Sequence, residues 1–513
     1  MTKKLLLLSC AASSLLATNG VNMIGTGTVS RSMGGTGVAF FSSGSDAMNK
    51  NTALIADVKE SELHLDVTYF NATVTSTVYD QMVLNTTPSY DGPVTATSQN
   101  HLDTNFIPTL SYASKLDDTW SWGASMFGVA GLGVDYKDEL AQRQLKTGMM
   151  LMKIIPGISY RTGNTTFGFA PVLGLGSMSI NYDEDQSRVG ANGEPLQSTR
   201  EGLFGTNIGG SDLVPAFGWQ AGMDIKVTDK LRIGTTYQSS LKYKYKDVAN
   251  FNQFGPHGMV LMANDYLKAQ GETGFSENST ETTDAMIQAL IDSGMPADAA
   301  NTVGQLMPAG LISDSLKATN PKNLNDLVME QPWEVAIGFG YELTDKVTVT
   351  GDYRYIAWGL AEGYKDFGWE NQSVYALGFE FRPNKQFRFR GGYNYADSPI
   401  KNVSGEMGSL LTDVQGTYVF DQAISMLNMV GFPAIATTHF TLGAGYDFSE
   451  NLTIDAAFMY SPETETSRSG SLVPGATSAL TDGMIPTSPV DMNYEYSTKM
   501  EQMTLSMGVN YRF

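Results

Sequence analysis

The residue types most often used for catalysis are few in this 513-residue sequence and show no catalytic spacing. None of the four histidines, His64, His101, His257 and His439, belongs to an HExxH motif, and no GxSxG motif is present. A catalytic triad assembles in space, however, and need not leave a local pattern. The only cysteine, Cys10, falls in a segment that we expect to be removed. The sequence therefore favours a protein that is not an enzyme and holds no metal ion or cofactor.

Positively charged side chains alternate with apolar ones in two later segments. Lys242 and Lys244 alternate with apolar residues, and Arg354 lies between two tyrosines. Successive side chains of a strand point to opposite faces, so these cations would share the face opposite the apolar one. Such a face could bind an anionic group, or its charges could simply solvate one another.

The elements that carry these cations repeat an apolar and polar alternation from Glu62 to Phe513. Tight turns alternate with long polar loops at about 71–104, 184–212, 248–332, 398–435 and 463–498. This pattern predicts an all-β fold, a transmembrane antiparallel β-barrel of roughly fourteen strands with its long loops outside the cell. A soluble β-sandwich has no reason to place every long loop at one end. In such a barrel the cations face the lumen or its rim, because a charge facing lipid is costly.

Composition and charge limit the partners. The net charge of −20 argues against nucleic acid, which requires a basic surface. No stretch approaches the roughly 18 apolar residues that a spanning helix needs. Residues 1–19 carry two lysines, at positions 3 and 4, followed by an apolar run, which predicts a signal peptide whose cleavage site is defined only to within a few residues. The apolar run before Cys10 is too short to favour a lipoprotein.

Two further segments stand apart from the strand pattern. Residues 20–57 are rich in glycine and lack both a helical and a strand period, so we expect them to fill the lumen of a barrel formed by 58–513. In the longest loop, four apolar residues would share one face of a short helix. They are Met286, Ile287, Leu290 and Ile291. This face could pack as a cap on its neighbours, or it could form a groove for a hydrophobic molecule.

Several motifs in chain order resemble the FadL-type outer-membrane transporters of long-chain fatty acids and aromatic hydrocarbons. They are GVNM at 20–23, Arg31, GGTGVA at 34–39, NTAL at 51–54, NFIP at 105–108, WGAS at 122–125, GLG at 131–133, SSLK at 239–242 and DSP at 397–399. The family's Asn-Pro-Ala motif reads Asn51-Thr52-Ala53 here, and threonine does not fix φ as proline does. The terminal Phe513, with Tyr511 two residues before it, resembles the signal read by the barrel-assembly machinery.

This resemblance implies a fourteen-stranded barrel with a movable N-terminal hatch, through which hydrophobic compounds diffuse without an energy source. External loops would capture the compound, a lumenal pocket would bind it, and it would leave sideways beside a kinked third strand. A general porin and a surface adhesin are the main alternatives, and an outer-membrane enzyme is a more remote one. We expect a monomer in the bacterial outer membrane, in contact with lipid and lipopolysaccharide.

The resemblance also assigns expected roles to residues. The hatch would include Arg31, Gly34, Gly35, Gly37, Asn51, Thr52 and Ala53. The lateral opening would lie at Gly128, Gly131 and Gly133 in the third strand, where glycines favour a bulge. A carboxylate head group would be bound by Lys242 and Lys244 first, with Arg354 and Arg388 as further candidates.

Overall fold

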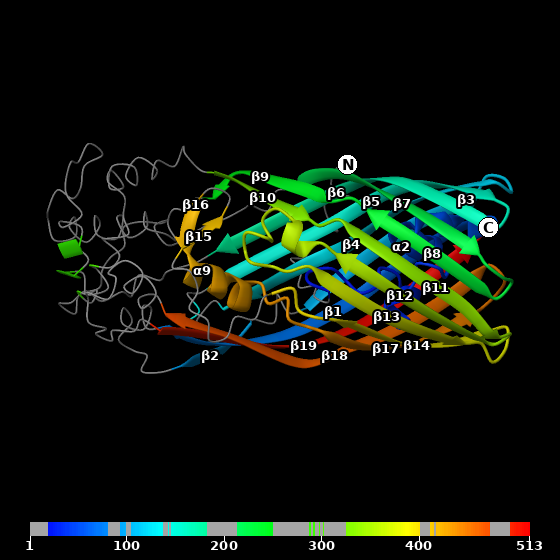
Figure 1. Cartoon of the computed structure of the whole chain (residues 1–513). Coiled ribbons are helices and arrows are strands. Elements are labelled where there is room, and N and C mark those ends of the chain that lie inside the picture. Colours follow the sequence, from blue (N-terminus) through cyan, green and yellow to red (C-terminus); the bar gives the residue numbers. More distant parts are fainter. Residues whose placement is uncertain are drawn as a thin grey trace, which may run out of the picture.

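The computed structural model of the chain describes residues 19–80, 93–98, 104–136, 142, 145–181, 213–249, 325–400, 411–414, 417–471 and 493–513, with a few residues between 287 and 301. These residues form a closed antiparallel barrel that stands around the N-terminal segment (Figure 1). Among them, no helix is both long and apolar enough to cross a membrane.

Fourteen strands form the wall in the described part of the chain, and pairing of the last strand with the first closes it. They are β1 (Ser61–Asp80), β3 (Thr104–Lys115), β4 (Trp120–Asp135), β5 (Lys146–Thr162), β6 (Thr165–Asn181), β7 (Val214–Lys226), β8 (Leu231–Gln238), β11 (Glu334–Thr344), β12 (Val347–Ile356), β13 (Gln372–Phe381), β14 (Phe387–Ala396), β17 (Thr438–Asp447), β18 (Leu452–Ser471) and β19 (Asn493–Arg512). Short turns join strands at one end and long connections join them at the other (Figure 1). The predicted fold class is confirmed.

The strands alternate between a lumenal and an outer face, as the sequence pattern predicts. In β13, Ala376 and Glu380 are buried, whereas Leu377 and Phe379 are 55% and 44% exposed. Exposed apolar side chains of this kind continue around the barrel, which leaves an apolar belt far larger than a soluble monomer tolerates. Aromatic pairs such as Trp120 with Tyr160, whose ring centroids lie 4.8 Å apart, border this belt.

Two predicted loops are shorter than expected, because three strands run on past the barrel wall. β1, β18 and β19 are each 20 residues long, so 71–80, 463–471 and 493–498 are strand rather than loop. A four-residue strand, β2 (Val94–Thr97), pairs with the end of β1. The outer faces here are polar, as in the 2.8 Å contact between the Thr77 and Thr95 hydroxyls. Because the outer face of these extensions is polar, and buried apolar residues such as Val74 and Val78 lie on the inner face, they lack the apolar outer face by which the wall strands were recognised.

The N-terminal segment lies inside the barrel and contains short helices that the sequence did not predict. They are α1 (Thr28–Ser32), α2 (Gly44–Lys50) and the 3₁₀ helix η1 (Thr52–Asp57). All residues of α1 are buried. Helices of five to seven residues are too short to show an apolar period.

Three other segments enter the lumen from the end of the long connections. β9 (Leu241–Ala249) pairs only with β10 (Asn325–Gln331) among the described strands. Residues 357–371 connect β12 and β13 and contain the short helix η3 (Trp358–Leu360). α9 (Asp421–Met426) continues into the π-helix η4 (Leu427–Gly431), and a small hairpin of β15 (Leu411–Val414) and β16 (Thr417–Phe420) precedes it.

Candidate functional site in the lumen

Arg31 ties the hatch to the seam of the barrel. Its guanidinium is 1% exposed and donates to Ser506 Oγ on β19 at 2.6 Å and to Thr68 Oγ1 on β1. It also donates to the Gly25 carbonyl at 2.9 Å, which closes the chain back on itself. Burial lowers the pKa of Arg31 to about 10, although neighbouring aspartates act in the opposite direction. Arg31 therefore fixes the first helix of the hatch to the wall through neutral hydroxyl groups.

The hatch glycines approach the wall more closely than other residues could. Gly34 and Gly35 have φ values of 68° and 80°, in the left-handed region that favours glycine. A Cβ at Gly34 would lie 2.6 Å from the Tyr393 carbonyl oxygen of β14. The Gly34 amide donates to Thr441 Oγ1 at 2.9 Å, and the Gly37 amide donates to Asp352 Oδ2 at 2.8 Å. These glycines let the backbone itself bind polar groups of the wall.

The Asn51-Thr52-Ala53 motif lies at the junction of α2 and η1. Asn51 Nδ2 donates to the Val38 carbonyl at 2.8 Å and to the Met223 carbonyl at 3.0 Å, and Asn51 Oδ1 accepts from the Ala53 amide at 3.1 Å. Thr52 Oγ1 accepts from Gln220 Nε2 of β7 at 2.6 Å. A proline has no group that could accept this bond. In this chain, Thr52 lacks the fixed φ that proline would have, but it forms a hydrogen bond with the barrel wall.

Glycines on the inner wall form a matching set that the sequence analysis did not select. At each of them, a Cβ would overlap hatch atoms within the range that real Cβ atoms avoid. They are Gly157, Gly168, Gly222, Gly234, Gly338, Gly340, Gly378, Gly392 and Gly443, on β5, β6, β7, β8, β11, β13, β14 and β17. Their signal was available in the sequence, since each occupies a lumenal position of its strand. The hatch and the wall are therefore shaped for close contact on several sides.

The third strand of the wall, β4, loses its pairing with β3 near its middle. Pairing of β3 with β4 ends at Thr109 opposite Phe127, and the register between β4 and β5 shifts between Gly128 and Ala130. Gly131 and Gly133 lie beyond this shift and still pair with β5. The three glycines expected at a lateral opening therefore flank an irregular part of the wall, in which β4 no longer pairs with β3.

The first described residues of the chain occupy that irregular part from the inside. The Met23 amide donates to the Val129 carbonyl at 2.9 Å, and the Gly131 amide donates to the Val21 carbonyl at 3.4 Å. Asn22 and Ala130 form an antiparallel bridge between the two segments. Val21–Met23 thus pair with the edge of β4 that β3 leaves unpaired.

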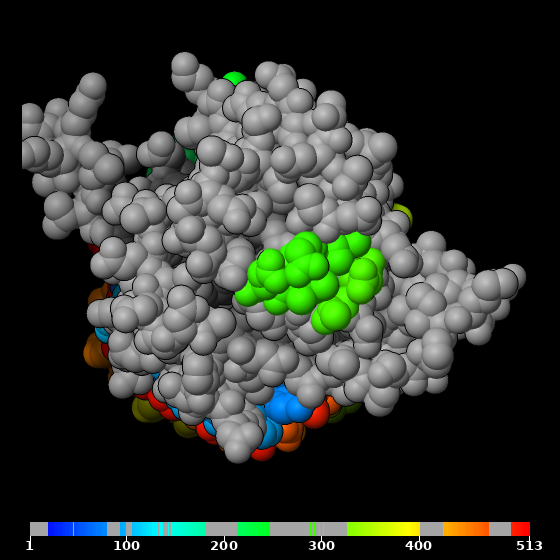
Figure 2. Space-filling view, turned by 90° about the vertical axis from the view of Figure 1, so that its left-hand side faces the viewer, coloured from blue at the N-terminus to red at the C-terminus, as the bar shows by residue number. Residues whose placement is uncertain are grey.

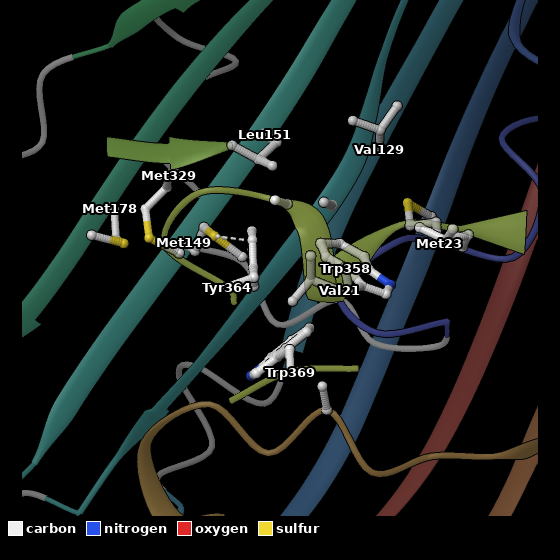
Figure 3. Packing of buried hydrophobic residues seen from close by; sticks show 14 of the residues in the cluster. Val21, Met23, Val129, Met149, Leu151, Met178, Met329, Trp358, Tyr364 and Trp369 are labelled. Atoms are coloured by element: carbon white, nitrogen blue, oxygen red, sulfur yellow. Dashed lines mark hydrogen bonds between the residues drawn. The ribbon is translucent and has the colours of Figure 1, made fainter. Parts of the chain in front are cut away.

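Apolar side chains converge on the same place (Figure 3). The buried cluster there includes Val21, Met23, Val129, Met149, Leu151, Met178, Met329, Trp358, Tyr364 and Trp369. Ring centroids of Trp358, Tyr364 and Trp369 lie 4.7 to 5.2 Å apart. The Tyr364 hydroxyl lies 3.5 Å from Met149 Sδ (Figure 3). Flexible methionines and aromatic faces can adapt to apolar molecules of different shapes.

Lys242 and Lys244 do not lie in this cluster, and the prediction that they face an apolar lumenal pocket is wrong. Their side chains are 58% and 56% exposed. Lys242 Nζ lies 2.9 Å from Glu362 Oε2, and Lys244 Nζ lies 2.7 Å from Asp326 Oδ2. Both ammonium groups are therefore already paired with carboxylates.

The error has a local cause, because the alternation changes phase between β8 and β9. Even-numbered residues such as Thr236 and Gln238 are buried in β8, but Tyr243 and Tyr245 are buried in β9. The two serines at 239–240 belong to neither strand. A shift of one residue exchanges the two faces of a strand. Lys242 and Lys244 therefore lie on the exposed face of β9, opposite the buried tyrosines.

The two arginine candidates lie apart from each other. The Arg354 side chain is 9% exposed on the lumenal face of β12, and its Nη1 lies 3.8 Å from Glu334 Oε2. Arg388 forms an ion pair with Asp447 near the short-turn end of the barrel. The structure therefore does not gather the four cationic candidates into one site.

Two buried lysines were missed in the sequence. Lys50 ends α2, and burial lowers its pKa to about 7, with a further contribution from Arg354 and an opposing one from Asp352. Lys153 on β5 is buried and donates to Gln238 Oε1 at 3.0 Å. Neither residue had a recognisable signal, because one lies in the hatch and the other inside an apolar strand.

The expected capture groove falls mostly outside the described residues. Met286 and Leu290 are not among them, whereas Ile287 and Ile291 are half-buried in helical residues. Gln288 Nε2 donates to Asp292 Oδ1 at 2.8 Å within the same short segment. Figure 2 looks onto this end of the molecule and shows the described residues between 287 and 301 as an exposed patch.

A closed barrel with an apolar outer belt and a plugged lumen defines the class of outer-membrane barrels whose interior is filled by their own chain. Residues 8–407 match the family described as outer membrane protein transport protein (OMPP1/FadL/TodX), and the chain belongs to this family. The resemblance seen in the sequence is confirmed, and the protein is a multi-pass protein of the bacterial outer membrane.

Relatives and solved structures agree with this assignment. The chain is 23% identical over 321 residues to a long-chain fatty acid transport protein of Escherichia coli, covering 60% of this chain and 63% of that protein. It is 22% identical over 245 residues to a 47 kDa outer membrane protein of Pasteurella multocida, covering 48% of this chain and 43% of that protein. The matches therefore span less than two thirds of either relative.

Solved structures cover nearly the whole chain. A FadL homologue of Pseudomonas aeruginosa has a TM-score of 0.57 at 13% identity, covering 96% of this chain and 99% of that one. The toluene transporter TbuX of Ralstonia pickettii has a TM-score of 0.54 at 16% identity, with the same coverage. At these identities the likeness establishes the fold.

Proposed function

We propose that the protein is a channel for passive uptake of hydrophobic compounds, long-chain fatty acids or aromatic hydrocarbons, across the outer membrane. The observation that carries this proposal is the position of Val21–Met23, which hydrogen-bond to β4 where β3 has separated from it. An apolar cluster of methionines and aromatic rings lies against the same residues. The names of the family and of its relatives, which include transporters of fatty acids and of toluene, support the same reading.

The proposed path has four steps. The external loops capture the compound, and it then takes the place of side chains in the apolar cluster, where each buried CH₂ contributes about 0.8 kcal/mol. Val21–Met23 and the rest of the hatch then shift, which frees the edge of β4. The compound leaves sideways into the membrane beside Gly128, Gly131 and Gly133.

Uptake by a deletion strain that carries the cloned gene tests this proposal. We expect the gene to restore uptake of oleate, of an alkylbenzene, or of both, relative to the empty vector. No uptake of either probe would contradict the proposal. Large stable pores in planar bilayers would instead favour a general porin, and cell binding without transport would favour an adhesin.

Removing both lysines of β9 tests the carboxylate site that the sequence suggested. Because the ammonium groups of Lys242 and Lys244 already have carboxylate partners, we expect Lys242→Ala/Lys244→Ala to change uptake of either probe by less than about twofold. The measurement is the initial uptake rate per folded barrel, with Lys365→Ala as an exposed control. A selective loss of oleate uptake alone would restore the lysines as a head-group site.

A further inference from the structure

Two segments close the lumen above the hatch, on the side of the long connections. We call residues 357–371 the strap and residues 421–436 the crossbar. The crossbar is anchored to the wall on two sides, because Thr147 Oγ1 of β5 donates to the Gly431 carbonyl at 2.5 Å and Thr498 Oγ1 of β19 donates to the Met429 carbonyl. It therefore bridges strands that lie on either side of β1, β3 and β4 in the barrel.

Asn428 joins the crossbar to the strap. Its Oδ1 accepts from Trp369 Nε1 at 3.0 Å, and its Nδ2 donates to the Phe367 carbonyl at 2.6 Å. Asn428 is 5% exposed and Trp369 is 4% exposed, so water does not compete for these bonds. One side-chain amide thus satisfies a buried indole and a buried backbone carbonyl of the strap.

The strap in turn covers the N-terminal segment. Trp358 is fully buried in the structure and lies against Gly20, whose φ is 66°. A Cβ at Gly20 would lie 2.8 Å from Trp358 Nε1, so the indole contacts the backbone directly. Figure 3 shows Trp358 beside Val21 and Met23, with Tyr364 and Trp369 on the same segment. Val21–Met23 have little freedom to leave β4 until this ring moves.

We propose that Asn428 is the latch of a second gate, formed by the strap and crossbar, which must open before the N-terminal segment can leave β4. This inference rests on the proposed uptake function, and it assigns Asn428 a positioning role toward the three aromatic rings. An apolar compound that enters the cluster replaces contacts of these rings and can release the strap. A polar solute offers no such contacts, so the latch restricts opening to hydrophobic compounds.

The test uses the full-length protein and two variants that break the same bond from opposite sides. Asn428→Ala removes both hydrogen bonds, and Trp369→Phe removes only the indole donor while keeping an aromatic ring. We expect Trp369→Phe to raise the initial rate of uptake per folded barrel by about fivefold, the effect of losing one ordinary hydrogen bond. Asn428→Ala should raise this rate at least as much, because it removes both hydrogen bonds. The double variant should gain no more than the larger single effect, because both changes release one latch. Lys365→Ala, an exposed change on the strap, should behave as wild type.

Acrylamide quenching of tryptophan fluorescence in the purified protein gives a second readout that needs no transport. Quenching in Asn428→Ala should exceed that of wild type and of Lys365→Ala, because Trp358 and Trp369 become accessible. If Asn428 were purely structural, Asn428→Ala would lower the amount of folded barrel, and total uptake with it, without raising the uptake rate per folded barrel. Unchanged quenching and an unchanged uptake rate would also overturn the latch. If wild-type protein transports neither probe, the proposed function fails, and the quenching comparison still decides the latch.

Discussion

Replacing Gly392 with valine is expected to release the hatch, so that trypsin cleaves it after Arg31 and Lys50. In the native structure these two side chains are 1% and 4% exposed, and they are the only basic residues between 20 and 57. A Cβ at Gly392 would overlap the Gly34 amide and lie 2.7 Å from Thr441 Oγ1. Valine would therefore displace the backbone that Gly34 places against β14.

The neighbouring residue provides a matched control. Gly391 lies on the same strand and faces outward, where the nearest atom to an added Cβ is the Thr441 carbonyl at 3.7 Å. We expect Gly392→Val to accelerate hatch cleavage by about tenfold or more, since overpacking costs roughly 1–3 kcal/mol and cleavage follows the open population. Gly391→Val should cleave like wild type. Equal rates in the two variants would contradict a tightly seated hatch, provided both barrels keep their heat-modifiable migration on gels.

The strands were predictable from the sequence because their signal is local and repeated. The segments around 440–448 and 452–460, with a turn between them, became β17 and β18. Each wall strand has the same apolar outer face, and antiparallel neighbours along the chain need only a short turn. The fourteen-stranded barrel and its plugged interior therefore followed from period and spacing.

The site was less predictable because its contacts join distant parts of the chain. Trp358 meets Gly20 across more than three hundred residues, and nothing near either one in the sequence indicates the other. The strap was not recognised, since 357–371 has neither a strand nor a helix period. The lysines of β9 were misplaced for a different reason, a local change of phase at 239–240 that hydropathy does not show. The local sequence pattern was therefore enough to predict the strands of the wall, whereas the arrangement of the lumen depends on contacts between residues far apart in the chain.

Cross-linking the N-terminal segment to β4 is expected to stop uptake without altering the barrel. Asn22 and Ala130 are partners in an antiparallel bridge. Such partners have Cα atoms about 4.5–5.5 Å apart, which is within the range that a disulfide spans. The sequence has one cysteine, Cys10, in the expected signal peptide, so Asn22→Cys/Ala130→Cys introduces the only pair in the processed chain.

The oxidised pair should lower the uptake rate by about tenfold or more, because a covalent bond removes the state in which Val21–Met23 leave the edge of β4. Reduction should restore the rate in the same sample. Ala444→Cys/Ala456→Cys provides a control, since these outward-facing residues are partners on β17 and β18, which stay paired in any hatch movement. If oxidised Asn22→Cys/Ala130→Cys transports as fast as its reduced form, the compound does not pass the break in β4. The path would then have to run past the hatch toward the short-turn end of the barrel, where the ion pairs of Asp57 with Arg161 and Arg232 would have to open instead.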